Sequence, residues 1–88
     1  MYLVYVLLSE KDGNFYIGQT NNLPSRIKRH SLGYVKSTRY RRPLNLVFYE
    51  EFENRAEAMR FEKFLKSGAG HAFLKQALVD TARKTGSG

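Results

Sequence analysis

An arginine and a histidine stand four residues apart in this sequence, at Arg26 and His30. In a helix this spacing places both side chains on one face. A guanidinium can hold a phosphate bidentately at any working pH, and an imidazole titrates near neutral pH. Arg26 could therefore hold a phosphate, or it could be one more solvated cation of a basic helix.

A second pair with helical spacing is Glu62 and Lys66. Spacing alone favours an exposed ion pair, which contributes a few tenths of a kcal/mol. A carboxylate is also the oxygen ligand that Mg²⁺ prefers. His71 follows the glycine-containing break at 68–70, and we expect a surface residue there without a catalytic role.

The net charge of +7 is concentrated in one part of the chain. Residues 21–43 hold no acidic residue and carry Arg26, Lys28, Arg29, Lys36, Arg39, Arg41 and Arg42. Such a block indicates an anionic partner, most commonly nucleic acid, or else a solvated face. Tyr34 and Tyr40 lie among these cations and could stack on unpaired bases or simply pack in the loop.

Composition excludes several classes of protein. The chain has 88 residues, of which 42% are hydrophobic, so we expect one globular domain over 1–84 and a flexible tail over 85–88. Cysteine is absent, which excludes disulfides, thiolate metal sites and cysteine nucleophiles and is compatible with the cytoplasm. No apolar run approaches the length of a membrane helix, and Met1–Leu8 alternates like a strand instead of resembling a signal peptide.

The elements that must position these residues follow from periodicity and caps. Apolar alternation and turn residues predict strands over 2–8, 15–20 and 44–52, and N-cap residues and breaks predict helices over 23–31, 55–66 and 70–83. Asp12-Gly13 favours a hairpin between the first two strands. In the third strand, Leu44, Leu46 and Phe48 are expected on one face. The fold class is α/β: a small, mainly antiparallel three-stranded sheet flanked by helices, in the order β-β-α-β-α-α.

The order of these motifs resembles the GIY-YIG nuclease superfamily, particularly its small stand-alone members and, more distantly, the N-terminal nuclease domain of a bacterial excinuclease. The first triplet is degenerate, as Leu3-Val4-Tyr5, and the second is intact, as Tyr16-Ile17-Gly18. Arg26, His30 and Glu62 follow at spacings similar to those of the family. The resemblance covers roughly residues 2–75.

The resemblance implies an endonuclease that hydrolyses DNA phosphodiester bonds with one divalent ion, Mg²⁺ or Mn²⁺. It implies that Glu62 holds the metal and that Arg26 holds the phosphate. Tyr5 or Tyr16, facing each other across the hairpin, would position or deprotonate the attacking water, with Tyr5 favoured and with cations needed nearby to lower its pKa. His30 would accept a proton from that tyrosine or donate to phosphate; two strand tyrosines that only stabilise the pair are the alternative.

The sequence also departs from the family pattern. Gln19 stands where several members have a lysine, and the stretch at Phe73-Leu74-Lys75 lacks the asparagine of excinuclease-type members. The expected function is cleavage in DNA repair, recombination or mobile-element processing, and the alternative is a catalytically weak nucleic-acid-binding module with the same basic face.

Contacts to the DNA phosphates are expected from the basic residues and from Gly18, where the substrate can approach the protein backbone closely. No targeting module is visible, so branched, flapped or single-stranded DNA is the expected partner, with weak sequence preference. No membrane partner is expected. The predicted nucleic-acid contacts are Gly18, Thr20, Arg29, Lys36, Thr38, Arg39, Arg41, Arg42 and Lys66.

Overall fold

Three strands and three α-helices make up the computed structural model, which describes the backbone of residues 1–86 and the side chains of residues 1–80. The predicted order β-β-α-β-α-α is confirmed, with one additional 3-10 turn before the third strand. The elements are β1 (Tyr2–Ser9), β2 (Phe15–Thr20), α1 (Leu23–Ser31), η1 (Arg39–Arg41), β3 (Leu44–Phe52), α2 (Arg55–Leu65) and α3 (Gly68–Gly86).

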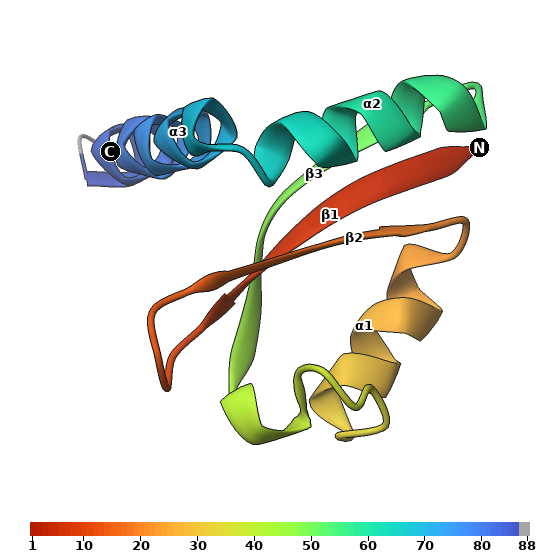
Figure 1. Ribbon diagram of the computed structural model, residues 1–88. Helices are drawn as coiled ribbons and strands as arrows, with labels where there is room; N and C mark the ends of the chain where they lie inside the picture. The colour runs from red at the N-terminus through yellow and green to blue at the C-terminus, as the bar shows by residue number, and fades with distance from the viewer. Residues whose placement is uncertain (87–88) are drawn as a thin grey trace.

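The sheet places β1 in the centre, in the order β2-β1-β3, and both pairs are antiparallel. The predicted hairpin of β1 and β2 turns through Gly13, whose φ of 72° lies in the left-handed region that glycine adopts without strain. Because β1 is central, four consecutive residues, Val4–Leu7, are fully buried from both faces. Figure 1 shows the strongly twisted sheet between the helices.

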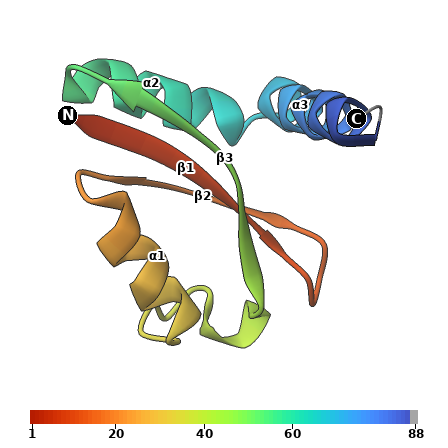
Figure 2. The same cartoon turned by 180° about the vertical axis from the view of Figure 1, so that it is seen from behind.

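Helices cover the two faces of the sheet separately. α1 lies on one side of the sheet and α2 and α3 lie on the other, as both views show (Figures 1 and 2). Val4, Val6 and Ile17 pack with Ala58 and Leu65 in the core on the α2 and α3 side. Alternation along β1 therefore sends Tyr5 and Leu7 to the α1 side.

The helix N-termini form where the caps predicted them. The side chain of Asn22 accepts a hydrogen bond from the Ser25 amide at 3.2 Å, and that of Asn54 accepts one from the Glu57 amide at 2.8 Å. Each cap satisfies an amide that has no partner inside its helix. The caps thus fix where α1 and α2 begin, and with them the positions of their functional side chains.

The alternation predicted for β3 is wrong because the strand carries a β-bulge. Leu46 pairs with Leu7, whereas Phe48 pairs with Val6, so the register shifts by one residue between them. Consecutive residues of β1 point to opposite faces, and so Leu46 and Phe48 cannot share a face. The bulge lets both Val47 and Phe48 pack against the core.

The last helix is longer than its sequence pattern indicated. It begins at Gly68 instead of residue 70, and it continues to Gly86 through two of the four positions expected in a tail; residues 87 and 88 lie outside the described residues. No proline interrupts the chain after 68, so nothing in the sequence ends the helix earlier. A Cβ at Gly70 would collide with the carbonyl of Phe64, so this glycine allows α3 to start tight against α2. Within the described residues, no helix is both long and apolar enough to span a bilayer.

Candidate active site

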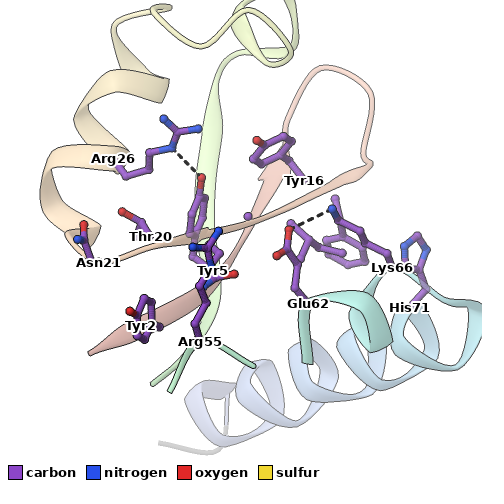
Figure 3. Close-up of a pocket in the computed structure, with 14 residues that line it drawn as sticks. Tyr2, Tyr5, Tyr16, Thr20, Asn21, Arg26, Arg55, Glu62, Lys66 and His71 are labelled. Atoms are coloured by element: carbon purple, nitrogen blue, oxygen red, sulfur yellow. Dashed lines mark hydrogen bonds and ion pairs between the residues drawn. The ribbon is translucent and has the colours of Figure 1, made fainter. Parts of the chain in front are cut away.

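A cleft of about 790 Å³ opens along the edge strand β2 (Figure 3). Residues of α1, on one side of the sheet, and residues of α2 and α3, on the other side, line it together. Four of the five predicted catalytic residues border it: Tyr5, Tyr16, Arg26 and Glu62. They come from β1, β2, α1 and α2, and they are separated by up to 57 positions in the sequence. The fifth, His30, lies behind Tyr5 and is 1% exposed.

Gly18 makes room for the Tyr5 ring in the cleft floor. The two residues are direct partners across the β1–β2 pair. A Cβ at Gly18 would lie 2.5 Å from the Tyr5 hydroxyl, closer than any real contact allows. The glycine of the YIG triplet is therefore required by the tyrosine of the first triplet, and it need not touch the substrate to be important.

The Tyr5 hydroxyl is held by two hydrogen bonds. Arg26 Nε donates to it at 3.2 Å, as the dashed line in Figure 3 marks. His30 Nε2 lies 2.9 Å from it on the buried side. Tyr5 is itself 0% exposed, so water does not reach its hydroxyl. This contradicts the expectation that Tyr5 is the tyrosine in contact with the attacking water.

Tyr16 is the half-buried tyrosine at the cleft surface. It pairs with Leu7, not with Tyr5, so the two tyrosines sit diagonally on the same face instead of directly opposite. The Tyr16 ring centroid lies 6.3 Å from that of Tyr5 and 5.0 Å from that of His30. Tyr16 thus covers the buried pair on the side that faces solvent.

Burial and Arg26 set the charge states of this group. Burial raises the pKa of Tyr5, and this outweighs the lowering effect of the Arg26 hydrogen bond. Burial, together with the nearby Arg26 charge, lowers the pKa of His30 to about 4. The hydrogen bond to Tyr5 raises the pKa of Arg26. At neutral pH the group is therefore a neutral tyrosine, a neutral imidazole and a fixed cation.

The opposite wall of the cleft is built by α2 and the start of α3. Lys66 Nζ contacts Glu62 Oε2 at 3.1 Å, the ion pair that their spacing predicts. Arg55 and His71 line the same wall, and the His71 ring packs edge-on against Phe15 at 5.9 Å. Over the whole cleft, the charged side chains are three cations and one carboxylate: Arg26, Arg55, Lys66 and Glu62. This balance favours an anionic ligand.

Sequence reasoning missed Arg55 and His71 as cleft residues, because the path of α2 and α3 around the sheet is a tertiary property. Phe15 in β2 is the apolar residue that His71 packs against, but the two are 56 positions apart in the sequence, so no local pattern pairs them. The cleft also includes Tyr2 and Asn21, which were not predicted, and Gln19, the position at which several family members have a lysine.

The donor set of the cleft fits one divalent ion of the magnesium type. Mg²⁺ keeps several waters and needs only one or two carboxylates, and Glu62 offers one carboxylate whose Oε2 is already near a cation. No cluster of three or more His, Cys, Asp or Glu side chains occurs among the described residues, so a cage made wholly of protein ligands is not built here.

The structure divides the predicted nucleic-acid contacts into two groups. Gly18, Thr20 and Lys66 line the cleft. The other six lie outside the cleft: Arg29, Lys36, Thr38, Arg39, Arg41 and Arg42. Thr38 is 0% exposed, and this burial contradicts its assignment as a nucleic-acid contact.

Two of the loop arginines are engaged by the chain itself. Arg41 forms an ion pair with Asp12 at 2.9 Å, and it also donates to the Asn14 carbonyl at 3.2 Å. Arg42 donates to the carbonyls of Arg39 and Ser31. These contacts tie the loop after α1 to the hairpin turn and to the end of α1. Arg29 and Lys36 remain exposed and available for a partner.

Comparison with known proteins places this arrangement in a family. Residues 1–71 match the family described as the GIY-YIG catalytic domain. The chain therefore belongs to the GIY-YIG family, which confirms the resemblance carried by Tyr5, Tyr16-Ile17-Gly18, Arg26 and Glu62.

Within that family, the chain is similar to proteins named UPF0213. It is 48% identical to a UPF0213 protein of Clostridium perfringens over 75% of this chain and 71% of that one. It is 44% identical to the UPF0213 protein YazA of Bacillus subtilis over 64% of this chain and 58% of that one. The solution NMR structure of a UPF0213 protein of Bacillus halodurans aligns with a TM-score of 0.55 and 38% identity, over 86% of this chain and 84% of that one.

Proposed function

We propose that this protein is a metal-dependent endonuclease that hydrolyses DNA phosphodiester bonds. The observation that carries the proposal is the cleft itself. One wall presents Tyr16 and a permanently charged Arg26 that is fixed by Tyr5, and the opposite wall presents Glu62 among cations. Membership of the GIY-YIG family supports the same reaction class.

Arg26 is the group that holds the scissile phosphate. Its Nε is used by Tyr5, which orients the guanidinium and leaves the terminal nitrogens for phosphate oxygens. A preoriented cation stabilises charge that develops on the phosphoryl oxygens without reorganising during the reaction. Tyr5 is therefore a positioning residue in this proposal.

Tyr16 is the group that contacts the attacking water. It is the tyrosine at the cleft surface, whereas Tyr5 is closed to water. Its proton can pass inward, because the Tyr16 ring lies 6.3 Å from that of Tyr5, whose own hydroxyl is bonded to His30 Nε2. The proton of the water goes to Tyr16, the Tyr16 proton to Tyr5 and the Tyr5 proton to His30 Nε2. His30 carries this extra proton only transiently, because its pKa of about 4 makes the imidazole release it at neutral pH.

Glu62 is the residue that would hold the divalent ion, which when bound neutralises charge on the phosphate and assists the leaving oxygen. Without an ion, Lys66 keeps the carboxylate in place by its ion pair. Lys66 and Arg55 provide the second wall with positive charge for the DNA backbone.

The substrate class within this proposal is DNA with an accessible single strand, such as a flap, a branch or a gap, with little sequence preference. The cleft groups named above contact phosphates and water, and phosphate contacts carry no base information. Roles in repair, recombination or mobile-element processing are consistent with that substrate.

A nuclease assay tests the proposal. Labelled single-stranded, duplex and flapped DNA are incubated with the parent protein, with Mg²⁺, with Mn²⁺ or with EDTA. Glu62→Gln keeps the size and the hydrogen bond to Lys66 but removes the charge, and we expect it to lose at least about 10²-fold in rate. Glu57→Gln is the matched control, since Glu57 is an exposed carboxylate of the same helix outside the cleft.

Metal-dependent cutting by the parent and the control, with loss in Glu62→Gln, supports the proposal. Equal cutting by Glu62→Gln refutes the role of Glu62. Salt-sensitive DNA binding with no cutting under any metal condition replaces the proposal with the binding module.

A further inference from the structure

The side chain of Thr38 is buried completely, although it follows the exposed Lys36 and Ser37 in the basic loop. Its Oγ1 lies 2.8 Å from His30 Nδ1. The turn that begins at Val35 holds it there, because the Thr38 amide donates to the Val35 carbonyl at 3.1 Å. Thr38 thus touches neither the cleft nor solvent. The side chain with which it shares a hydrogen bond is that of His30, which lies behind Tyr5.

The hydrogen bonds around His30 are satisfied in one direction. Arg26 is only a donor, so the Tyr5 oxygen accepts from it. The other hydrogen bond of the Tyr5 hydroxyl is to His30 Nε2, which accepts the Tyr5 proton in one of the two possible directions of this row. A neutral imidazole with an accepting Nε2 carries its proton on Nδ1 and donates it to Thr38.

Thr38 can accept that proton because its own hydroxyl has an outlet. The Thr38 hydroxyl donates to the Val35 carbonyl at 3.5 Å. A continuous row of donors and acceptors therefore runs from Arg26 through Tyr5 and His30 to Thr38 and ends at a backbone carbonyl. Every buried polar group in the row has a partner in this direction.

We propose that Thr38 is a positioning residue, whose hydroxyl holds His30 in the tautomer that accepts the proton of Tyr5. With this tautomer, the Tyr5 oxygen acts as an acceptor toward the two groups that face the cleft, Arg26 and Tyr16. Tyr16 can then point its proton inward and offer its oxygen lone pairs to the attacking water.

The opposite tautomer would reverse this polarity. His30 Nε2 would donate to Tyr5, and the Tyr5 proton would turn toward Tyr16. Tyr16 would then direct its own proton at the water and could not receive one. The functional consequence rests on the proposed nuclease mechanism, whereas the tautomer is a property of the protein alone, and the two are measured separately.

Two substitutions test the role of the Thr38 hydroxyl. Thr38→Val keeps the branched shape and removes the hydroxyl, and Thr38→Ser keeps the hydroxyl and removes the methyl group. The tautomer of His30 is read from the ¹⁵N chemical shifts of its two ring nitrogens at neutral pH. Single-turnover cleavage of flapped DNA with Mg²⁺ is measured in the same three proteins.

We expect the proton on Nδ1 in the parent and in Thr38→Ser, and a shift of population toward Nε2–H in Thr38→Val. We expect Thr38→Val to cleave about 10–100-fold more slowly, by analogy with the loss of an outer hydrogen-bond partner of a metal-ligating residue. Thr38→Ser should cleave close to the parent, because it keeps the hydroxyl. If Thr38 acted only through packing of its methyl group, Thr38→Ser would be the slower variant and Thr38→Val would cleave like the parent.

A parent protein with Nε2–H, or a Thr38→Val protein with an unchanged tautomer, overturns the proposal. If the parent cuts no DNA, the proposed function fails, but the ¹⁵N result still decides the role of Thr38. If Thr38→Val does not fold, Thr38→Ala, which also lacks the hydroxyl, takes its place in the ¹⁵N measurement, and a parent protein with Nε2–H still overturns the proposal.

Discussion

Acid should destabilise this protein through His30, and the structure gives the size of the effect. The imidazole is 1% exposed and lies between Tyr5 and Thr38, with Arg26 on the same helix and Tyr16 against its ring. Burial, together with the Arg26 charge, lowers its pKa from 6.5 to about 4. In the unfolded chain the ordinary value applies.

The sign follows from which state binds the proton. Between about pH 6.5 and about pH 4 the unfolded chain protonates His30 and the folded protein does not, so stability falls as the pH falls through this window. A tenfold difference in proton affinity is worth about 1.4 kcal/mol, and the two pKa values therefore correspond to about 3 kcal/mol. For a chain of this length, such a loss lowers the melting temperature by more than about 10 °C.

The assay is urea unfolding followed by far-UV circular dichroism at pH 7, 6, 5 and 4, with the parent beside His30→Gln. Gln does not titrate, so the free energy of unfolding of the variant lacks the His30 contribution. Asp12, whose pKa is lowered by the Asn14 backbone and by Arg41, also loses stability in acid, but it is common to both proteins and cancels in the difference. We expect the difference between parent and variant to change by about 3 kcal/mol over this window.

Parallel losses in the two proteins would show that His30 is not a buried neutral imidazole and would refute the charge assignment of the site. If His30→Gln does not fold, an NMR titration of the parent decides the same point, since the chain has two histidines and a His71→Asn protein assigns their signals. A His30 signal that titrates near pH 6.5 would have the same meaning as parallel losses.

Three further substitutions probe the cleft. Gly18→Ala places a methyl group against the Tyr5 hydroxyl, and we expect about 1–3 kcal/mol of destabilisation in thermal unfolding; an unchanged melting temperature would mean that Tyr5 is free to move. Arg26→Lys keeps the charge but loses the fork that serves Tyr5 and phosphate together, so cleavage should fall by about 10²-fold while Arg60→Lys, on the exposed face of α2, cuts like the parent. Tyr16→Phe should abolish most cleavage with the fold intact, as judged by circular dichroism, and full activity would exclude Tyr16 as the water-facing base.

Local order was determined by the sequence alone. Asparagine caps, a glycine turn and apolar periodicity predicted every strand and α-helix, because these signals act over a few residues and need no distant partner. The family motif likewise identified Tyr5, Tyr16, Arg26, His30 and Glu62 as one group, and a matching family confirms the resemblance. The ion pair of Glu62 and Lys66 followed from helical spacing.

Tertiary structure decided which of those residues meet the cleft and in what state. The bulge in β3, the contact of Arg41 with Asp12 and the approach of His71 to Phe15 each join segments far apart in the chain, and no local pattern encodes such pairs. Burial was decided in the same way. Thr38 sits in a basic, polar loop, yet the fold closes it against His30, and the same burial withdraws Tyr5 from water and keeps His30 uncharged. Burial and charge state depend on what packs around a side chain, and that packing exists only once β1, β2, α1 and the loop after it are assembled.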